Sequence, residues 1–341
     1  MSRREKRGDK SNVNPFTNNC RTGESSTNQR YKNYVPLDFM KAKIIPDKIN
    51  DLLNNPLLDF GEARIDKNGR RATCRRARYL NFVFQYYPDS RYMVLSGSLH
   101  TFYNDAKNNA NDFDVGAFYE VLKRMFDLFG LSPQHLTITQ LEWGVNLLSE
   151  YTNPIIDHCL FYKTKRFEVI YKSKKSNYRR ASLTEFALKI YNKGLHFNLG
   201  YDILRIERKQ NNWAKYCNRY NIGRTLFDLI ESDFQGLRKT LTKNWDDILF
   251  YDPFIPESET STLKYRDTFY WQKLRNDKSN VWVKKQRDLL RLANCEKGRD
   301  LQVGIANDIK LKLNALNCDK LMNPVFSYKE NMLTTIINKH Y

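Results

Sequence analysis

The sequence has few of the features that mark disulfide-rich secreted proteins or zinc modules. Its six cysteines lie far apart, with no Cys-x-x-Cys pair and no histidine at zinc-finger spacing. We therefore expect the cysteines to be reduced thiols. A structural zinc site built from distant residues is a much less favoured alternative. The cysteines are Cys20, Cys74, Cys159, Cys217, Cys295 and Cys318.

Long apolar runs are also missing. No stretch of about 18 consecutive apolar residues occurs, so a membrane-spanning helix is not expected. The first residues lack the apolar core of a signal peptide. The sequence therefore predicts a soluble, intracellular protein.

Negative charge is scarce relative to positive charge. The chain has 57 lysines and arginines against 38 aspartates and glutamates, which gives a formal net charge of +19 over 341 residues. Such a surplus attracts a polyanion, because contacts to phosphates release condensed counterions. The charge favours nucleic acid over acidic metabolites as the partner.

Composition changes along the chain predict three regions. Residues 1–35 are polar and basic, which is typical of a disordered arm that either keeps the protein soluble or follows phosphates. Residues 36–252 carry strand and helix patterns and form the expected catalytic and DNA-binding domain. A Pro, Ser and Thr-rich boundary at 252–262 precedes a basic, helical region over 263–341.

The patterns within the middle region predict an α+β domain. One helix is expected over 112–131, with Asp112 or Asp114 as N-cap and Gly130 as its stop, because its apolar residues recur at helical spacing. Strands are expected on both sides of it, so an antiparallel β-sheet backed by a helix is the predicted architecture. The expected strands cover 77–87, 91–100, 137–148, 166–172, 184–194 and 201–209.

Side chains alternate across a strand, so parity predicts which residues share a face. In each of four strands one parity is apolar and the other is polar, as expected for a sheet with one solvated side. Ordinary surface complementarity would also produce this pattern. The polar side is predicted to hold Gln140, Glu142, Gly144 and Asn146, then Lys189, Tyr191 and Lys193, then Arg205, Glu207 and Lys209, and finally Ser96, Ser98 and His100.

Two kinds of chemistry are available on this predicted face. Glu142 and Glu207 offer the hard oxygen ligands that Mg²⁺ or Mn²⁺ prefers, and Asn146 or His100 would be further contacts. Tyr191 lies among Lys189, Lys193 and Arg205, which we expect to lower the pKa of its phenol and to hold a phosphate. The alternative for Tyr191 is a residue that only covers the sheet.

Two further stretches combine positive charge with aromatic rings. Residues 171–180 suit single-stranded nucleic acid, because phosphates meet the charges while bases stack on rings; the alternative is an exposed, solubilising loop. Residues 263–299 suit duplex DNA, or else form amphipathic helices with a solvated basic side, in which Trp271 and Trp282 pack. The first stretch contains Tyr171, Lys172, Lys174, Lys175, Tyr178, Arg179 and Arg180.

Four short blocks, GSLHTFYN, LEWGVN, LKIYNKG and ILRIERK, occur in that order. Together they resemble the rolling-circle replication initiators of phages, plasmids and mobile elements, including the gene II type, over roughly residues 78–250. The resemblance implies an endonuclease that uses Mg²⁺ or Mn²⁺ to nick origin DNA, single-stranded or in a hairpin. The nucleophilic tyrosine would remain on the 5′ phosphate and free a 3′ hydroxyl.

Carried onto this chain, the resemblance makes Tyr191 the nucleophile, Glu142 and Glu207 the metal ligands, and Lys193 the residue that stabilises the phosphorane. Lys172, Lys174, Lys175, Arg179, Arg180, Lys189 and Arg205 would bind DNA. It also implies host helicase and polymerase as partners and the cytoplasm of a bacterial host as the location.

The chain departs from this family in two respects. Many members bind metal through a His-hydrophobic-His pair, which is absent here, so either carboxylates replace it or the metal site has been lost. Tyr162 and Tyr171 each have a lysine three residues later and are alternative nucleophiles. The histidines are His100, His135, His158, His196 and His340.

Two functions of other classes compete with nicking. A sequence-specific DNA-binding protein that recruits replication proteins or represses a promoter needs the basic patches but not Glu142, Glu207 or Tyr191. An RNA-binding protein would use the same sheet and aromatic residues.

Overall fold

The computed structural model describes residues 33–61 and 74–317, which belong to one compact unit. Most of the predicted arm over 1–35 lies outside the described residues. Its last two residues do not behave as an arm, because Tyr34 and Val35 are fully buried in the core.

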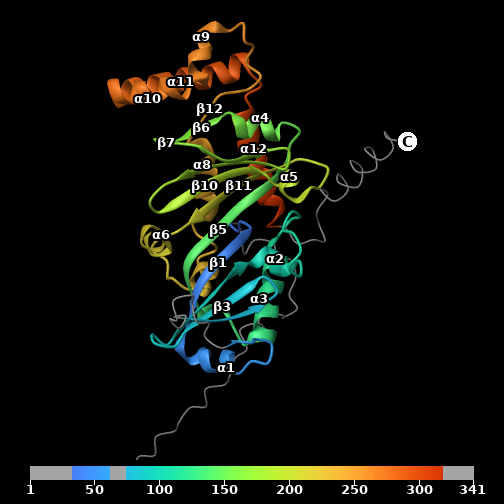
Figure 1. The fold of residues 1–341 in the computed structure, drawn as a ribbon. Helices are drawn as coiled ribbons and strands as arrows, with labels where there is room; N and C mark the ends of the chain where they lie inside the picture. The colour runs from blue at the N-terminus through green and yellow to red at the C-terminus, as the bar shows by residue number, and fades with distance from the viewer. Residues whose placement is uncertain (1–32, 62–73, 318–341) are drawn as a thin grey trace, which may run out of the picture. The chain divides into compact units, whose positions relative to one another are not determined.

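The fold is centred on a nine-stranded antiparallel sheet with the order β2-β3-β4-β1-β5-β11-β10-β9-β8 (Figure 1). Together with the helices this confirms the predicted α+β class. A small second sheet has the order β12-β6-β7. The strands of the large sheet are β1 Leu37–Ile44, β2 Arg75–Tyr79, β3 Phe82–Tyr87, β4 Tyr92–Ser98, β5 Leu136–Leu148, β8 Glu168–Ser173, β9 Ser176–Ser182, β10 Phe186–Asn192 and β11 Ile203–Gln210; those of the small sheet are β6 Cys159–Tyr162, β7 Lys165–Arg166 and β12 Ile248–Phe250.

The strand predictions need several corrections, of which three concern the layout of the large sheet. Residues 77–87 do not form one strand, because the chain turns at Leu80 and Asn81 and pairs β2 with β3. The basic stretch 171–180 is not a loop but most of the β8–β9 hairpin. Strand β1 was not predicted, although it lies in the middle of the sheet between β4 and β5.

The predicted helix over 112–131 is confirmed as α3, Val115–Phe129. The Asp114 side chain accepts a hydrogen bond from the Ala117 backbone N–H, and Gly130 ends the helix with a φ of 62°, a left-handed conformation that glycine adopts easily. The other α-helices are α1 Ile49–Leu53, α2 Leu99–Tyr103, α4 Thr152–Asp157, α5 Lys193–Phe197, α6 Trp213–Tyr220, α7 Leu226–Glu231, α8 Leu237–Asp246, α9 Thr260–Leu263, α10 Thr268–Asp277, α11 Asn280–Lys297 and α12 Leu301–Ala315.

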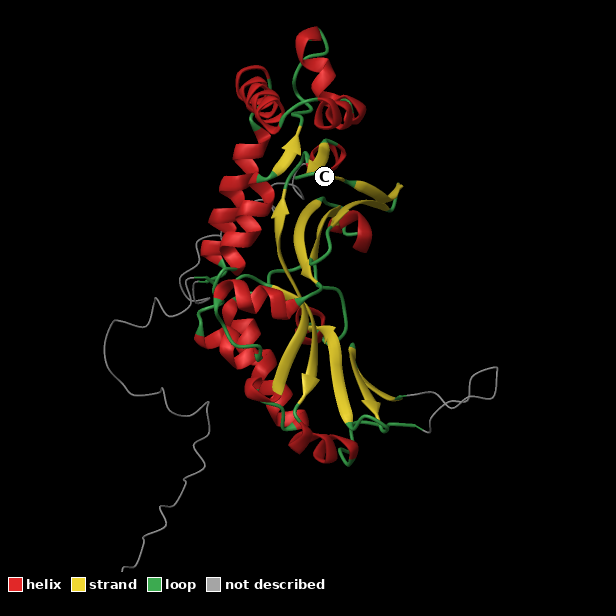
Figure 2. Cartoon of the chain, turned by 90° about the vertical axis from the view of Figure 1, so that its left-hand side faces the viewer, coloured by secondary structure: helices red, strands yellow, loops and turns green. Residues whose placement is uncertain are grey.

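The helices gather mainly along one face of the large sheet, as Figure 2 shows. The main core lies between them and the apolar side of strands such as β5 and β10, where Leu141, Val145, Leu188 and Ile190 are all fully buried. The opposite side of these strands carries the polar residues. This arrangement is what the alternation in the sequence predicts.

The C-terminal helices join two different cores. Helices α10 and α11 pack with the small sheet in a second core, which includes Phe161, Trp271 and Leu290. Helix α12 instead returns to the main core, against α8 and β5.

The predicted boundary at 252–262 stays a prediction. Trp271 is buried as expected, but the expectation that Trp282 packs is wrong, because half of its surface is exposed.

Two further predictions concern membrane-spanning helices and disulfides. In the described ranges, no helix combines the length and apolarity needed to cross a bilayer. The four described cysteines, Cys74, Cys159, Cys217 and Cys295, are free thiols, as expected.

The return of α12 to the main core makes a stability prediction. Ile309 is fully buried, so Ile309→Ala should lower the free energy of unfolding by about 2–5 kcal/mol through lost burial and a new cavity. Leu311 on the same helix is 66% exposed, and Leu311→Ala should change stability by less than about 0.5 kcal/mol. Urea unfolding of both variants measures the difference. Equal, small effects would show that α12 does not pack on the sheet.

Candidate active site

A buried arginine holds the polar face of the sheet together. Arg205 lies on β11 with 1% of its surface exposed, and its guanidinium contacts three strands. Nε donates to Glu207 Oε2 at 3.2 Å, Nη1 to Asn146 Oδ1 at 3.2 Å, and Nη2 to Asp38 Oδ2 at 3.4 Å. Burial by itself lowers the pKa of Arg205, but the nearby charges, that of Glu207 first, raise it above its ordinary value. Arg205 is therefore a permanent cation.

Lys189 connects the two carboxylates that were predicted to bind metal. Its ammonium lies 2.7 Å from Glu142 Oε2 and 2.6 Å from Glu207 Oε1. Cross-strand pairing places Lys189 opposite Glu207, and Gly144 leaves room for Glu207, since a β-carbon there would lie 2.8 Å from the Glu207 α-carbon. The ammonium of Lys209 lies 3.0 Å from the other carboxylate oxygen of Glu142, Oε1.

The two carboxylates respond in opposite ways to this setting. Burial raises the pKa of Glu142, and the neighbouring charge of Glu207 raises it further. Burial acts in the same direction on Glu207, but the cations Lys189 and Arg205 outweigh it and hold its pKa far below the usual range. Glu207 is therefore ionised. Charges of alternating sign run along the face from Asp38 through Arg205, Glu207, Lys189 and Glu142 to Lys209.

Asp38 belongs to this network but was missed in the sequence. Its carboxylate accepts hydrogen bonds from Ser98 Oγ and from Asn109 Nδ2, in addition to Arg205. The alternation of apolar and polar residues in LDFMKAKI is a signal that could have revealed strand β1. A register shift between Leu37 and Met40 breaks the alternation, so parity counted from Met40 would still place Asp38 on the apolar side.

Tyr191 reaches the polar face as predicted, but its environment differs from the prediction. Its hydroxyl donates a hydrogen bond to Glu207 Oε2 at 3.4 Å. Burial raises the pKa of Tyr191 well above its ordinary value, and the charge of Glu207 raises it further, while Arg205 lowers it less. The expectation that neighbouring cations lower this pKa is therefore wrong. The phenol is protonated at neutral pH.

Lys193 and His100 lie in a buried corner beside Arg205. Lys193 does not lie on the strand but begins α5, with 1% of its surface exposed, and its amine has no hydrogen-bond partner among the described residues. Burial, and then the charge of Arg205, lowers the pKa of Lys193 to about 7. His100 does not lie on the strand predicted over 91–100 but in α2, because the chain turns into a helix after Ser98, and its Nε2 is 2.8 Å from Asn111 Oδ1. Burial, and then Lys193, lowers the pKa of His100 to about 4.

The carboxylates do not fit a divalent metal as they stand. Each of the four oxygens of Glu142 and Glu207 already contacts a lysine or arginine nitrogen. Asn146 and His100 are engaged elsewhere, with Arg205 and Asn111 respectively. Over the described ranges, no three histidines, cysteines or carboxylates are placed to share an ion. Metal binding at Glu142 and Glu207 stays a prediction from the sequence.

The β8–β9 hairpin brings its rings to Tyr191. Tyr171, which is 63% exposed, lies 6.4 Å from Tyr178 between ring centroids, and Tyr178 lies 5.5 Å from Tyr191. Three rings thus form a row from the exposed hairpin to the polar face. Of the alternative nucleophiles, Tyr171 is accessible. Tyr162 is buried and donates its hydroxyl proton to Asn244, so it cannot meet a substrate without unfolding of the core.

The cations of the hairpin differ in how strongly they are bound within the protein. Lys172 and Arg179 both pair with Asp157, at 2.8 and 3.3 Å. Lys174 and Lys175 near the hairpin turn are exposed and have no carboxylate partner in the described part of the chain. These two lysines are the hairpin charges most available to a polyanion.

Removal of Arg205 should show how much the network depends on one cation. Arg205→Met leaves Asp38 and Glu207 without their shared partner, and we expect a loss of about 3–5 kcal/mol in the free energy of unfolding. Lys209 is one-third exposed and has one carboxylate partner, so Lys209→Met should cost less than about 1 kcal/mol. Chemical denaturation compares the two, and a cost for Arg205→Met no larger than that of Lys209→Met would contradict the central role of Arg205.

Lys193 should give a distinctive dependence of stability on pH. Its pKa is about 7 in the folded protein and near 10.5 when unfolded, so between these values the unfolded chain binds more protons. The stability of the wild-type protein should therefore rise with pH through this window relative to Lys193→Met. The variant should be the more stable protein below pH 7, and the difference should shrink toward pH 10. Thermal unfolding at a series of pH values measures it, and parallel curves would rule out a buried amine of low pKa.

Comparisons with known proteins identify no family for this chain. No protein-family model matches the sequence, and no curated protein matches it. Among solved structures, the chain is similar to a rolling circle replication initiator protein from Geobacillus stearothermophilus, with 12% sequence identity and a TM-score of 0.37 over 74% of this chain and 95% of that one. A TM-score of 0.37 does not establish a shared fold, so the case for function depends on the site itself.

Proposed function

We propose that this protein is a replication initiator that nicks DNA, with the Tyr191 hydroxyl as the nucleophile. The contact between the Tyr191 hydroxyl and ionised Glu207, at the inner end of a row of rings from a basic hairpin, carries this proposal. The order of the four sequence blocks supports an initiator over other nucleases. The cationic hairpin supplies the expected attraction for DNA.

The residues of this site can move the proton that the reaction requires. Because the phenol is protonated at neutral pH, its proton must leave as the oxygen attacks, and Glu207 Oε2 is already its acceptor. The bond from the Tyr191 oxygen to phosphorus forms as the bond to the 3′ oxygen breaks. DNA is left joined through its 5′ phosphate, and the 3′ oxygen takes a proton to become a hydroxyl.

Lys193 and Lys189 would have different roles in this reaction. The pKa of Lys193 is about 7, so a large fraction of this amine is protonated at neutral pH and would stabilise charge on the phosphorane. Lys189 is held between Glu142 and Glu207 and positions the acceptor carboxylate. No step of this scheme passes through a metal ion, and the Mg²⁺ or Mn²⁺ requirement is a separate prediction.

The nucleophile can be identified by covalent capture. Wild-type protein mixed with labelled single-stranded DNA of the cognate origin should give protein-linked DNA on a denaturing gel. Tyr191→Phe should abolish the adduct while DNA binding is retained, because only the attacking hydroxyl is lost. Parallel reactions with Mn²⁺ and with a chelator test the metal requirement.

Two other tyrosines of the row serve as matched controls. Tyr178→Phe and Tyr171→Phe remove hydroxyls from the same row and should leave the adduct intact. An adduct that survives Tyr191→Phe and disappears in Tyr171→Phe would transfer the role of nucleophile to Tyr171.

A non-catalytic DNA-binding protein is the second candidate function. The raised pKa of Tyr191 and the occupation of both carboxylates by Lys189 favour it, since neither is typical of an activated nucleophile. Tight binding with no adduct from any tested DNA, with or without Mn²⁺, would support this function.

A further inference from the structure

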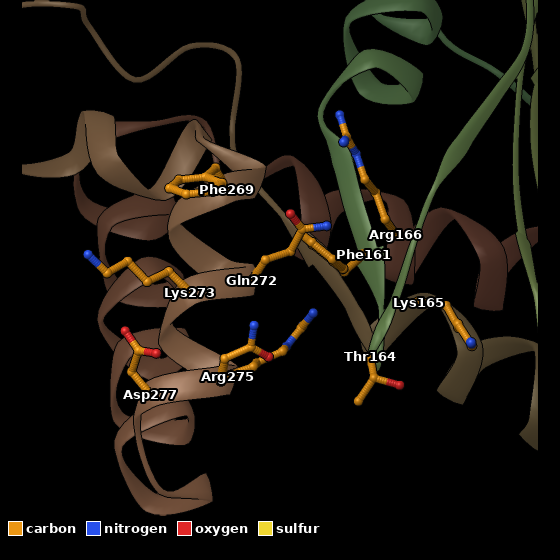
Figure 3. Close-up of a pocket in the computed structure, with 10 residues that line it drawn as sticks. Phe161, Thr164, Lys165, Arg166, Phe269, Gln272, Lys273, Arg275 and Asp277 are labelled. Carbon is orange, nitrogen blue, oxygen red and sulfur yellow. The ribbon is translucent and has the colours of Figure 1, made fainter.

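A second candidate site for a ligand lies away from the polar face of the sheet. An open groove of about 810 Å³ separates α10 from the β6–β7 hairpin (Figure 3). Thr164, Lys165 and Arg166 line one wall. This volume lies within the range of about 300–1,000 Å³ that is usual for sites that bind small organic ligands.

The two walls of the groove are fixed to each other. Arg275 of α10 donates from Nη2 to the Lys163 carbonyl at 2.7 Å, and its guanidinium lies 4.2 Å from the centroid of the Phe161 ring. Figure 3 shows Gln272 and Arg275 pointing from α10 toward Phe161. Phe161 and Trp271 are both buried in the core below. The groove is thus a built feature of the fold and not a gap between loose segments.

One side of α10 presents an unusual mixture of groups to this groove. Phe269, Gln272, Lys273 and Asn276 follow the spacing i, i+3, i+4 and i+7, so they share a helix face. Phe269 is 67% exposed and contacts no other aromatic ring in the described part of the chain. A large apolar ring left in solvent beside amide groups is suited to a flat, polar-edged partner such as a nucleobase.

The charge of the groove is strongly positive. Lys165, Arg166, Lys273 and Arg275 line it, against one carboxylate, Asp277, among its lining residues. Lys165, Arg166 and Lys273 have no acidic partner within the described ranges. Cations left without internal partners on both walls are available to phosphates on either side of a bound strand.

We infer that this groove binds a short segment of single-stranded DNA, with a base stacked on Phe269 and phosphates on Arg166 and Lys273. A single strand fits better than a duplex, because paired bases are stacked on each other and leave no face for Phe269, and because the groove has the volume of a few nucleotides. The choice of DNA as the nucleic acid rests on the proposed function. The groove itself is separate from the polar sheet face that carries Tyr191.

Binding can be measured apart from chemistry in the full-length protein with the Tyr191→Phe change. The probe is fluorescein-labelled oligodeoxythymidine of about 20 nucleotides, longer than the ~4–16 nucleotides that one binding module covers. Arg166→Ala with Lys273→Ala should weaken binding about tenfold or more. It should also reduce the slope of log affinity against log salt by about 1.4, because each contact to a single-strand phosphate contributes roughly 0.7. Lys239→Ala with Lys243→Ala on α8 removes the same charge outside the groove and should have a much smaller effect.

Stacking requires its own variant and its own control. Phe269→Ala should weaken binding about tenfold, and Phe269→Tyr should restore it, because the ring and not the residue identity carries the contact. Trp282→Ala removes another exposed aromatic residue, on α11 and outside the groove, and should change affinity little. Photocrosslinking with one 5-iododeoxyuridine in the probe should attach the DNA to the peptide that contains Phe269.

Several results would overturn the inference. They are unchanged binding in both groove variants, equal losses in the α8 control, and crosslinks confined to peptides outside the groove. Failure of the proposed function is a different outcome, seen as the absence of any adduct in wild-type protein. Loss of oligonucleotide binding in the groove variants would support the groove even then.

Discussion

The desolvated guanidinium of Arg205 is the interaction on which the polar face depends. A charge that has lost nearly all contact with water is costly unless carboxylates and hydrogen-bond acceptors replace the water. Here the replacements come from β1, β5 and β11, in the form of Asp38, Asn146 and Glu207. The same contacts therefore fix the relative positions of three neighbouring strands and set the charge on Glu207.

The position of Glu207 then determines what Tyr191 can do. Lys189 and Arg205 hold Glu207 ionised, which makes its carboxylate a weak base. The Tyr191 hydroxyl therefore keeps its proton in the resting protein. Under the proposed function, the basicity of Glu207 would increase if a DNA phosphate drew Lys189 toward itself and away from the carboxylate. Under that proposal, the substrate would activate its own nucleophile.

Much of this face follows from the alternation of residues in the sequence, and the reason is physical. A strand shows only two faces, so parity was sufficient to place Glu142, Lys189 and Tyr191 on the same side. Parity gives no distances, so it could not show that Lys189 would lie between two carboxylates, in the position a metal was expected to take. It also assumes unbroken alternation, which fails at Asp38 through a register shift and at Lys193 where β10 gives way to α5.

The formal charge of +19 does not show which basic residues are available to a polyanion. Lys189, Arg205 and Lys209 are neutralised by carboxylates within the protein, and Lys193 is close to half protonated at neutral pH. These residues contribute to structure and chemistry more than to long-range attraction. Other cations have no carboxylate partner among the described residues, among them Lys174 and Lys175 at the β8–β9 hairpin and Lys165, Arg166 and Lys273 in the groove beside α10. If the protein binds DNA as proposed, these cations are more available to phosphates than the neutralised cations of the polar face.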